Sequence, residues 1–228
     1  MTKNKIIVAL DVATKKEALD LVDQLGEQIS FFKVGLQLYT AEGPEIVRAI
    51  RAAGANVFLD LKLHDIPNTV ANAVRSAAEL AVQMLTFHLC GGEEMIRAAV
   101  SAKPRELSLL GVTVLTSVDE QTLRKIGIPD KIDDHVLRLA KLGAETGVDG
   151  LVASPHELKM LRAQFGTKIK LVVPGVRPTW SEAGDQKRVM TPREAFDAGA
   201  DYLVIGRPII AQPRPREALA QILAEIGA

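Results

Sequence analysis

The sequence has almost no cysteine, no long hydrophobic run and no excess of charge of either sign. Its one cysteine, Cys90, cannot form an intramolecular disulfide. No segment approaches the roughly 20 consecutive apolar residues that a membrane-spanning helix needs. The first residues run into a strand pattern and not into the apolar core of a signal peptide. These absences predict a protein of the reducing cytoplasm that has no membrane partner.

Charge balance excludes another class of partner. The 28 lysine and arginine residues equal the 28 aspartate and glutamate residues in number. A chain without net charge creates no global field that would attract nucleic acid, so any anionic partner must be small and bound locally. The length of 228 residues and the hydrophobic content of 47% fit one domain over residues 1–228.

What the sequence does contain is a regular alternation of short apolar runs and helical segments. Strands are predicted at residues 6–10, 31–35, 57–63, 84–88, 109–115, 150–153, 169–173 and 202–205. Helices are predicted from 14, over 44–53 and 67–80, after 92, over 133–146, from 155, from 191 and over 214–226. Nearly continuous apolar strands between helices indicate a buried parallel sheet. Eight such units favour an α/β fold of the closed (β/α)8 TIM-barrel type, with the active site at the C-terminal ends of the strands.

An open, doubly wound sheet is the competing fold. It is disfavoured because the glycine-rich dinucleotide fingerprint does not follow the first strand, where the chain reads Leu10-Asp11-Val12. Clustered histidine and cysteine ligands are also absent, so neither a cofactor nor a metal ion is expected.

The third predicted strand carries the most informative charges. Alternation along residues 57–63 places Asp60 and Lys62 on one face. Two charges near the end of an apolar strand are costly to desolvate unless they are paired, and Asp65 adds a second carboxylate just beyond the strand. Neighbouring carboxylates keep a lysine protonated, so Lys62 is a candidate proton donor. A purely structural salt bridge is the alternative.

Polar residues also end other strands, which is where barrel enzymes keep their sites. Those candidates are Asp11, Lys33, Asp60, Lys62, His88, Thr116, Arg177 and Arg207. The loops after the last two strands read Pro174-Gly175-Val176-Arg177 and Gly206-Arg207, and barrels often bind phosphate there. A phosphorylated substrate is therefore predicted. Residues 179–190, which include Gln186, have the length and glycine content of a lid.

Motifs distributed over the whole chain resemble those of the orotidine 5'-phosphate decarboxylase family. They are Asp60-x-Lys62-x-x-Asp65-Ile66-Pro67-Asn68-Thr69, Leu10-Asp11, Phe32-Lys33-Val34-Gly35, Leu115-Thr116-Ser117, Pro174-Gly175-Val176-Arg177, Asp185-Gln186 and Ile205-Gly206-Arg207. The resemblance implies decarboxylation of orotidine 5'-phosphate to uridine 5'-phosphate and CO2, the last step of de novo pyrimidine nucleotide synthesis, without a cofactor.

The resemblance also implies residue roles. Lys62 would protonate C6 of the pyrimidine, while Asp60 would lie against the departing carboxylate and help to keep Lys62 charged. Asp65 and Thr69 would act in the neighbouring subunit's site, which makes the protein a homodimer. The remaining contacts would be Lys33 and Asp11 with the ribose, Thr116 with the pyrimidine, and the Pro174 loop, Arg177, Gln186, Gly206 and Arg207 with the phosphate side.

Two other functions remain open. A magnesium-dependent sugar-phosphate decarboxylase or aldolase of the same barrel superfamily would share the Asp-x-Lys-x-x-Asp stretch, but it would need a glutamate where this chain has Lys33. A non-catalytic phosphate sensor would need no charged array. Among the remaining polar residues, Cys90 is expected to be buried, and His135 and His156 are expected on solvated helix surfaces.

Overall fold

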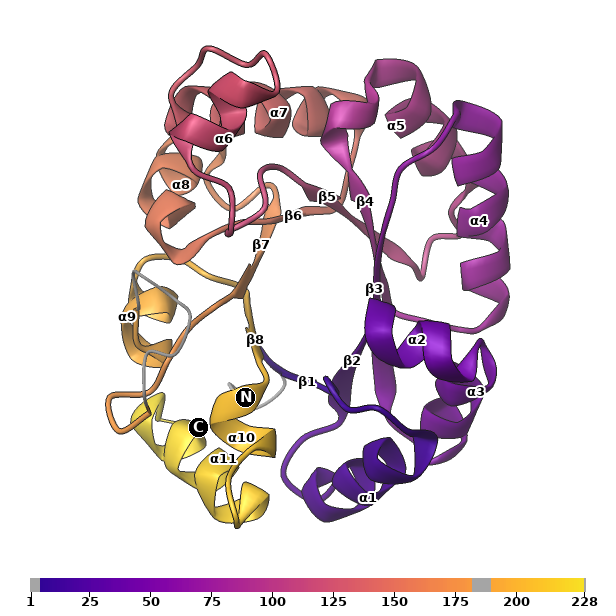
Figure 1. Ribbon diagram of the computed structural model, residues 1–228, viewed down its shortest axis with the longest axis vertical. Helices are drawn as coiled ribbons and strands as arrows, with labels where there is room; N and C mark the ends of the chain where they lie inside the picture. The colour runs from indigo at the N-terminus through magenta and orange to yellow at the C-terminus, as the bar shows by residue number, and fades with distance from the viewer. Residues whose placement is uncertain (1–4, 182–189, 228) are drawn as a thin grey trace.

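The computed structural model describes residues 5–181 and 190–227. Eight parallel strands close a barrel in chain order, with β8 paired to β1, and helices surround this ring (Figure 1). The strands are β1 Ile6–Ala9, β2 Phe31–Gly35, β3 Asn56–Leu63, β4 Met84–His88, β5 Ser108–Val112, β6 Gly150–Val152, β7 Lys170–Pro174 and β8 Tyr202–Ile205. The predicted (β/α)8 barrel is thereby confirmed.

The helices lie on the outside of the barrel. They are α1 Lys15–Leu25, α2 Leu36–Glu42, α3 Glu45–Ala52, α4 Pro67–Glu79, α5 Glu93–Ala102, α6 Glu120–Lys125, α7 Ile132–Thr146, α8 Leu158–Phe165, α9 Pro192–Asp197, α10 Arg207–Ile210 and α11 Pro215–Glu225, with short 3-10 turns η2 Leu89–Gly91 and η3 Pro155–Glu157. None of the helices in the described ranges is long and apolar enough to cross a membrane.

Local sequence signals explain where several helices begin. Thr14 and Thr191 each form a capping box with a glutamate three residues later, and Pro67 occupies the first turn of α4. Inside the ring, a separate apolar cluster fills the barrel and includes Ile7, Phe58, Met84, Leu110, Val172 and Val204. This packed floor leaves only the C-terminal mouth of the barrel available for a ligand.

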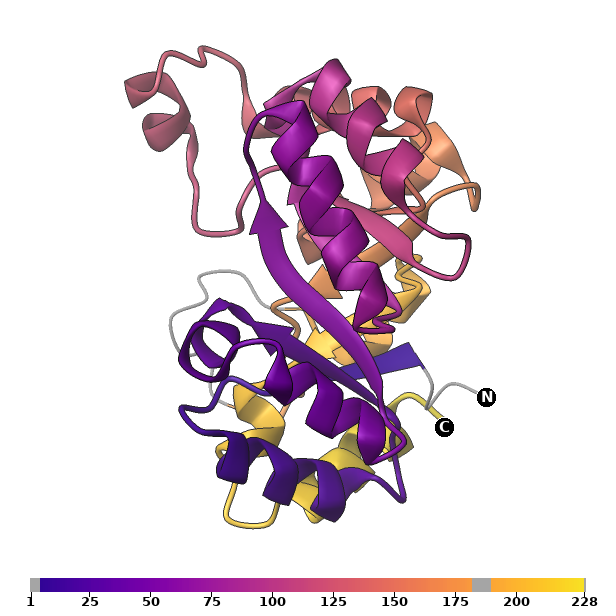
Figure 2. The same cartoon turned by 90° about the vertical axis from the view of Figure 1, so that its right-hand side faces the viewer.

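Three helices were not predicted, and β3 departs from regular alternation. Helices α2, α6 and α10 have 7, 6 and 4 residues, too few to show a clear helical period. Figure 2 shows α6 standing away from the other helices, joined to them by extended segments. In β3 the pairing with β4 shifts register between Leu59 and Leu63, and Lys62 has a φ of 51°.

Two expectations about individual side chains were wrong. Cys90 is exposed, because the η2 turn directs Leu89 into the core and leaves Cys90 on the outside. His135 is buried on α7: Asp130, from the segment before this helix, lies 3.6 Å from its Nδ1 atom and also pairs with Arg138, so this segment covers the histidine. His156 is exposed, as expected.

Candidate active site

A cavity of about 270 Å³ opens at the C-terminal ends of the strands. Residues in the C-terminal parts of seven of the eight strands, or just after them, line it, and they include nine of the predicted site residues. These nine are Asp11, Lys33, Asp60, Lys62, Thr116, Pro174, Arg177, Gly206 and Arg207. Val112, Val152 and Val204 contribute apolar wall. One side of the cavity is therefore charged and another is apolar, which suits a ligand with a planar ring and an anionic group.

The charged side is built from four residues: Lys33 on β2, Asp60 and Lys62 on β3, and Asp11 just after β1. The Lys62 Nζ atom lies 2.8 Å from Asp60 Oδ1, and the Lys33 Nζ atom lies 3.6 Å from Asp60 Oδ2 and 3.2 Å from Asp11 Oδ1. Asp60 is therefore held between two ammonium groups. The side chains of Asp60 and Lys33 are only 13% and 12% exposed, so this pair is largely removed from water. Charges in such surroundings interact more strongly than they would on the surface.

Opposing effects set the ionisation of Asp60. Burial acts to raise the pKa of its carboxyl, since desolvation penalises the charged form. Lys33, Lys62 and hydrogen bonds from Lys62 and Thr86 together outweigh burial and hold the pKa below its ordinary value. Asp60 is thus a carboxylate at neutral pH, with its negative charge facing the cavity.

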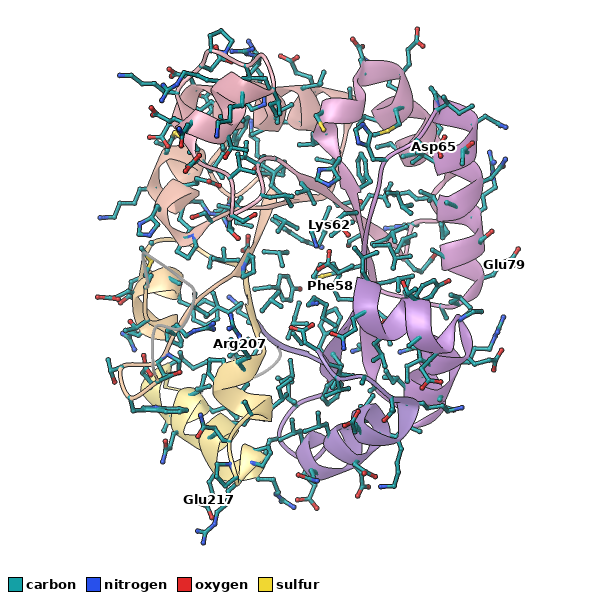
Figure 3. The ribbon with its side chains drawn as sticks, viewed as in Figure 1. Phe58, Lys62, Asp65, Glu79, Arg207 and Glu217 are labelled. Carbon is teal, nitrogen blue, oxygen red and sulfur yellow. The ribbon has the colours of Figure 1, made fainter. Side chains whose placement is uncertain are left out.

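Lys62 reaches the cavity from an unusual backbone position. Its φ of 51° lies in the left-handed region, which residues other than glycine, asparagine and aspartate seldom adopt. The register shift of β3 occurs at the same place. Figure 3 shows Lys62 and Phe58 pointing toward the centre of the ring of strands. Regular alternation along the strand predicted that Lys62 and Asp60 share one face. In the structure their contact is instead formed at a bulge.

The part of the cavity formed after β7 and β8 has the features expected of a phosphate site. Arg177 is 8% exposed, and its backbone N–H donates to the Met190 carbonyl at 3.0 Å. Gly206 lies against Asp11 and Ala9: a Cβ atom at this position would come within 3.2 Å of Asp11 Oδ2 and 3.3 Å of Ala9 Cβ. Arg207 follows at the start of α10 with an exposed side chain. Close backbone approach and two guanidinium groups suit recognition of a phosphate.

Several predicted residues are not part of this cavity. Asp65 and Thr69 are exposed, and the Asp65 carboxylate accepts the Ile66 backbone N–H at 2.7 Å. Figure 3 shows Asp65 on the outer rim, away from Lys62. Gln186 and residues 182–189 of the expected lid lie outside the described residues.

His88, a further candidate at the end of β4, does not line the cavity. Its ring centroid lies 5.7 Å from that of His64. Burial, followed by the nearby His64 and Lys62, lowers the pKa of His88, so its imidazole tends to be neutral. Over residues 5–181 and 190–227, no three histidine, cysteine or carboxylate side chains are grouped so that they could hold a metal ion.

Together, the barrel and its charged mouth define a (β/α)8-barrel protein of the class that binds small ligands at the C-terminal ends of its strands. The family model described as "Orotidine 5'-phosphate decarboxylase / HUMPS family" matches residues 4–222. The chain belongs to this family.

Individual relatives cover nearly the whole chain. An orotidine 5'-phosphate decarboxylase of Moorella thermoacetica is 48% identical over 98% of this chain and 92% of its own length. One of Opitutus terrae is 49% identical over 97% of each chain. The crystal structure of the orotidine 5'-phosphate decarboxylase from Lactobacillus acidophilus superposes with a TM-score of 0.87 at 34% identity, over 99% of this chain and 100% of that one.

Proposed function

We propose that this protein converts orotidine 5'-phosphate to uridine 5'-phosphate and CO2 without a cofactor. The observation that carries the proposal is the Asp11–Lys33–Asp60–Lys62 array, which faces the arginine-bearing loops after β7 and β8 across one cavity. The curated relatives of similar length carry the name orotidine 5'-phosphate decarboxylase, which supports the same reaction. The substrate is a phosphorylated nucleoside.

The chemistry requires a cation near the reacting carbon. Loss of CO2 breaks the bond between C6 and the carboxyl carbon and leaves the bonding electron pair on C6. The Lys62 ammonium would stabilise this developing negative charge and then transfer a proton to C6, forming the C–H bond of the product. Asp60 would lie beside the departing carboxylate and keep Lys62 oriented, because its Oδ1 atom is 2.8 Å from Nζ.

The remaining cavity residues would hold the non-reacting parts of the substrate. Lys33 and Asp11, whose charged atoms are 3.2 Å apart, would bind the ribose hydroxyls. Thr116 would contact the pyrimidine, and the Pro174 loop, Arg177, Gly206 and Arg207 would bind the phosphate side. Gln186, which lies outside the described residues, is proposed to act with them on the resemblance of its motif alone. Binding of the phosphate accelerates the reaction only if its contacts, by holding the pyrimidine against the charged array, stabilise the transition state more than the bound substrate.

The test of this reaction is the loss of orotidine 5'-phosphate absorbance in buffer containing a chelator. We expect rapid formation of uridine 5'-phosphate that neither the chelator nor added magnesium changes. Turnover of a sugar phosphate that depends on magnesium, with none of orotidine 5'-phosphate, would instead assign the chain to the metal-using barrel enzymes. Lys33 argues against that outcome, since an ammonium group would repel a divalent cation at the same cavity.

We also propose a homodimer in which Asp65 and Thr69 enter the neighbouring subunit's site. Both residues are exposed on the rim beside Ile66, a large apolar side chain that is 67% exposed. A second copy covering this rim would bring another carboxylate to the array and bury Ile66. We further propose that residues 1–228 form a single domain, since one barrel uses strands from residue 6 to residue 205. A cytoplasmic location is proposed with it.

Mixing two inactive variants tests the shared site. In a mixed dimer of Lys62→Ala and Asp65→Ala subunits, one site carries both substitutions and the other carries neither. Random exchange of subunits should therefore restore about one quarter of the parent's activity. Absence of any recovery, although mass spectrometry detects the mixed dimer, would contradict the shared site.

A further inference from the structure

A buried threonine connects the two central charged residues. Thr86 on β4 is fully buried, and its hydroxyl donates to Asp60 Oδ1 at 2.9 Å. The same hydroxyl oxygen accepts the backbone N–H of Lys62 at 2.9 Å. Asp60 Oδ1 in turn receives the Lys62 ammonium at 2.8 Å. Both ends of Lys62 are thus tied to the same carboxylate oxygen: the backbone N–H through the Thr86 hydroxyl, and the ammonium directly.

The backbone of Lys62 needs such a partner. Between Leu59 and Leu63 the ladder with β4 shifts register, so regular strand pairing is interrupted at this N–H. A buried N–H without a partner is costly, and the left-handed φ of 51° is itself unfavourable for a lysine. The Thr86 hydroxyl satisfies the N–H in the conformation that the site uses.

The direction of the hydroxyl proton follows from the same geometry. A threonine hydroxyl has one proton to donate and two lone pairs that can accept. Since Lys62 N–H occupies one lone pair, the single proton is available for Asp60. A hydrogen bond to a carboxylate favours its charged form. Thr86 therefore acts on both members of the pair, although it is not among the residues that line the cavity.

We infer that Thr86 is a positioning residue for the proposed decarboxylation, which aims the Lys62 ammonium and orients the Asp60 carboxylate through its single hydroxyl. The inference rests on the proposed function. It adds a residue that touches neither the cavity nor the substrate, and its effect should appear in the chemical step more than in substrate binding.

The substitution Thr86→Val removes the hydroxyl and keeps the branched shape. Because hydrogen bonds to charged groups are at stake, we expect kcat for orotidine 5'-phosphate to fall roughly 10- to 100-fold, with little change in KM. In the pH profile of kcat, the acid limb should also move to higher pH, since the hydrogen bond that keeps Asp60 charged is lost. Thr86→Ser keeps the hydroxyl, so its kcat should stay within about threefold of the parent value.

Thr146→Val is the matched control. Thr146 on α7 is a buried threonine whose hydroxyl donates to the Leu142 and Gly143 carbonyls of its own helix, so its loss should leave the pH profile of kcat unchanged. A parent-like kcat in Thr86→Val would overturn the inference, and so would a reduced kcat with an unmoved acid limb, which signifies a structural role alone. If Thr86→Val does not fold, Thr86→Cys takes its place, because its thiol is a weaker donor and acceptor: a reduced kcat with a shifted acid limb supports the inference, and a parent-like kcat or an unmoved acid limb overturns it. An inactive parent would instead refute the proposed function itself.

Discussion

Replacing Lys33 with methionine removes one of the two cations that hold Asp60. The Lys33 Nζ atom lies 3.6 Å from Asp60 Oδ2, which corresponds to about 5 kcal/mol of attraction at an effective dielectric constant near 20. Loss of one partner of a buried pair generally costs about 3 to 5 kcal/mol. Lys62 remains beside Asp60, and the variant no longer has to desolvate an ammonium group. We therefore expect Lys33→Met to lower the free energy of unfolding by about 2 to 3 kcal/mol near neutral pH.

The pH dependence identifies the cause. Asp60 has a pKa below its ordinary value of 3.8, so its contribution to stability is present above that pH and is lost as the pH falls through the native value. The stability difference between parent and Lys33→Met should therefore be constant near neutral pH and shrink in acid, where Asp60 becomes protonated. Asp11 adds little to this difference, because its side chain is 51% exposed.

Urea unfolding at fixed protein concentration measures both effects. Lys159→Met, at an exposed position of α8, is the control for exchanging a lysine for a methionine. In an Asp60→Asn background, Lys33→Met should lower the free energy of unfolding by less than it does in the parent, since the two residues are coupled. An equal cost in both backgrounds, or a cost in the parent no larger than that of the control, would refute the account of the array.

Three more predictions concern separate parts of the molecule. Burial, with a smaller contribution from Asp133, raises the pKa of Glu157 to about 7, although the hydrogen bond from the Ser154 backbone N–H acts to lower it. The native state therefore keeps a proton that the unfolded chain releases near pH 4.5, so stability falls as the pH rises toward 7 and stays lower above it. By calorimetry, Glu157→Gln should thus be more stable than the parent at pH 8 by up to about 3 kcal/mol, and equal to it near pH 4. Gly35→Ala would place a Cβ atom 2.8 Å from Lys33 Nζ, so kcat/KM should fall roughly 10- to 100-fold while the melting temperature changes little; an unchanged kcat/KM would show that Lys33 can move without consequence. Arg207→Ala, at an exposed position, should raise KM for orotidine 5'-phosphate roughly 10- to 100-fold and leave KM for phosphate-free orotidine unaltered, and an equal effect on both substrates would place Arg207 away from the phosphate.

Much of the fold was predictable because it depends on local patterns. Eight apolar runs with intervening helices sufficed for the barrel, and barrel topology then brought residues as distant in sequence as Asp11 and Arg207 to one cavity. Helices α10 and α6 escaped prediction, since they have only 4 and 6 residues, whereas the equally short α9 was marked by the Thr191 cap and Pro192.

The site was predictable in its members but not in its details. Side-chain alternation put Asp60 and Lys62 together, whereas the bulge and the left-handed φ of Lys62 depend on pairing with β4. Thr86 gave no sequence signal, because a lone threonine within an apolar strand is ordinary and its partners are 24 and 26 residues away. The roles proposed for Asp65 and Thr69 depend on a second copy of the chain, which no pattern within one chain can describe.

The most direct test of the central claim compares Lys62→Ala with the parent and with Lys159→Ala in orotidine 5'-phosphate turnover with chelator present. If Lys62 both stabilises the negative charge at C6 and delivers the proton, kcat of Lys62→Ala should fall by roughly 10⁴-fold or more, whereas Lys159→Ala should match the parent. A folded Lys62→Ala protein that retains turnover within about tenfold of the parent would contradict the claim.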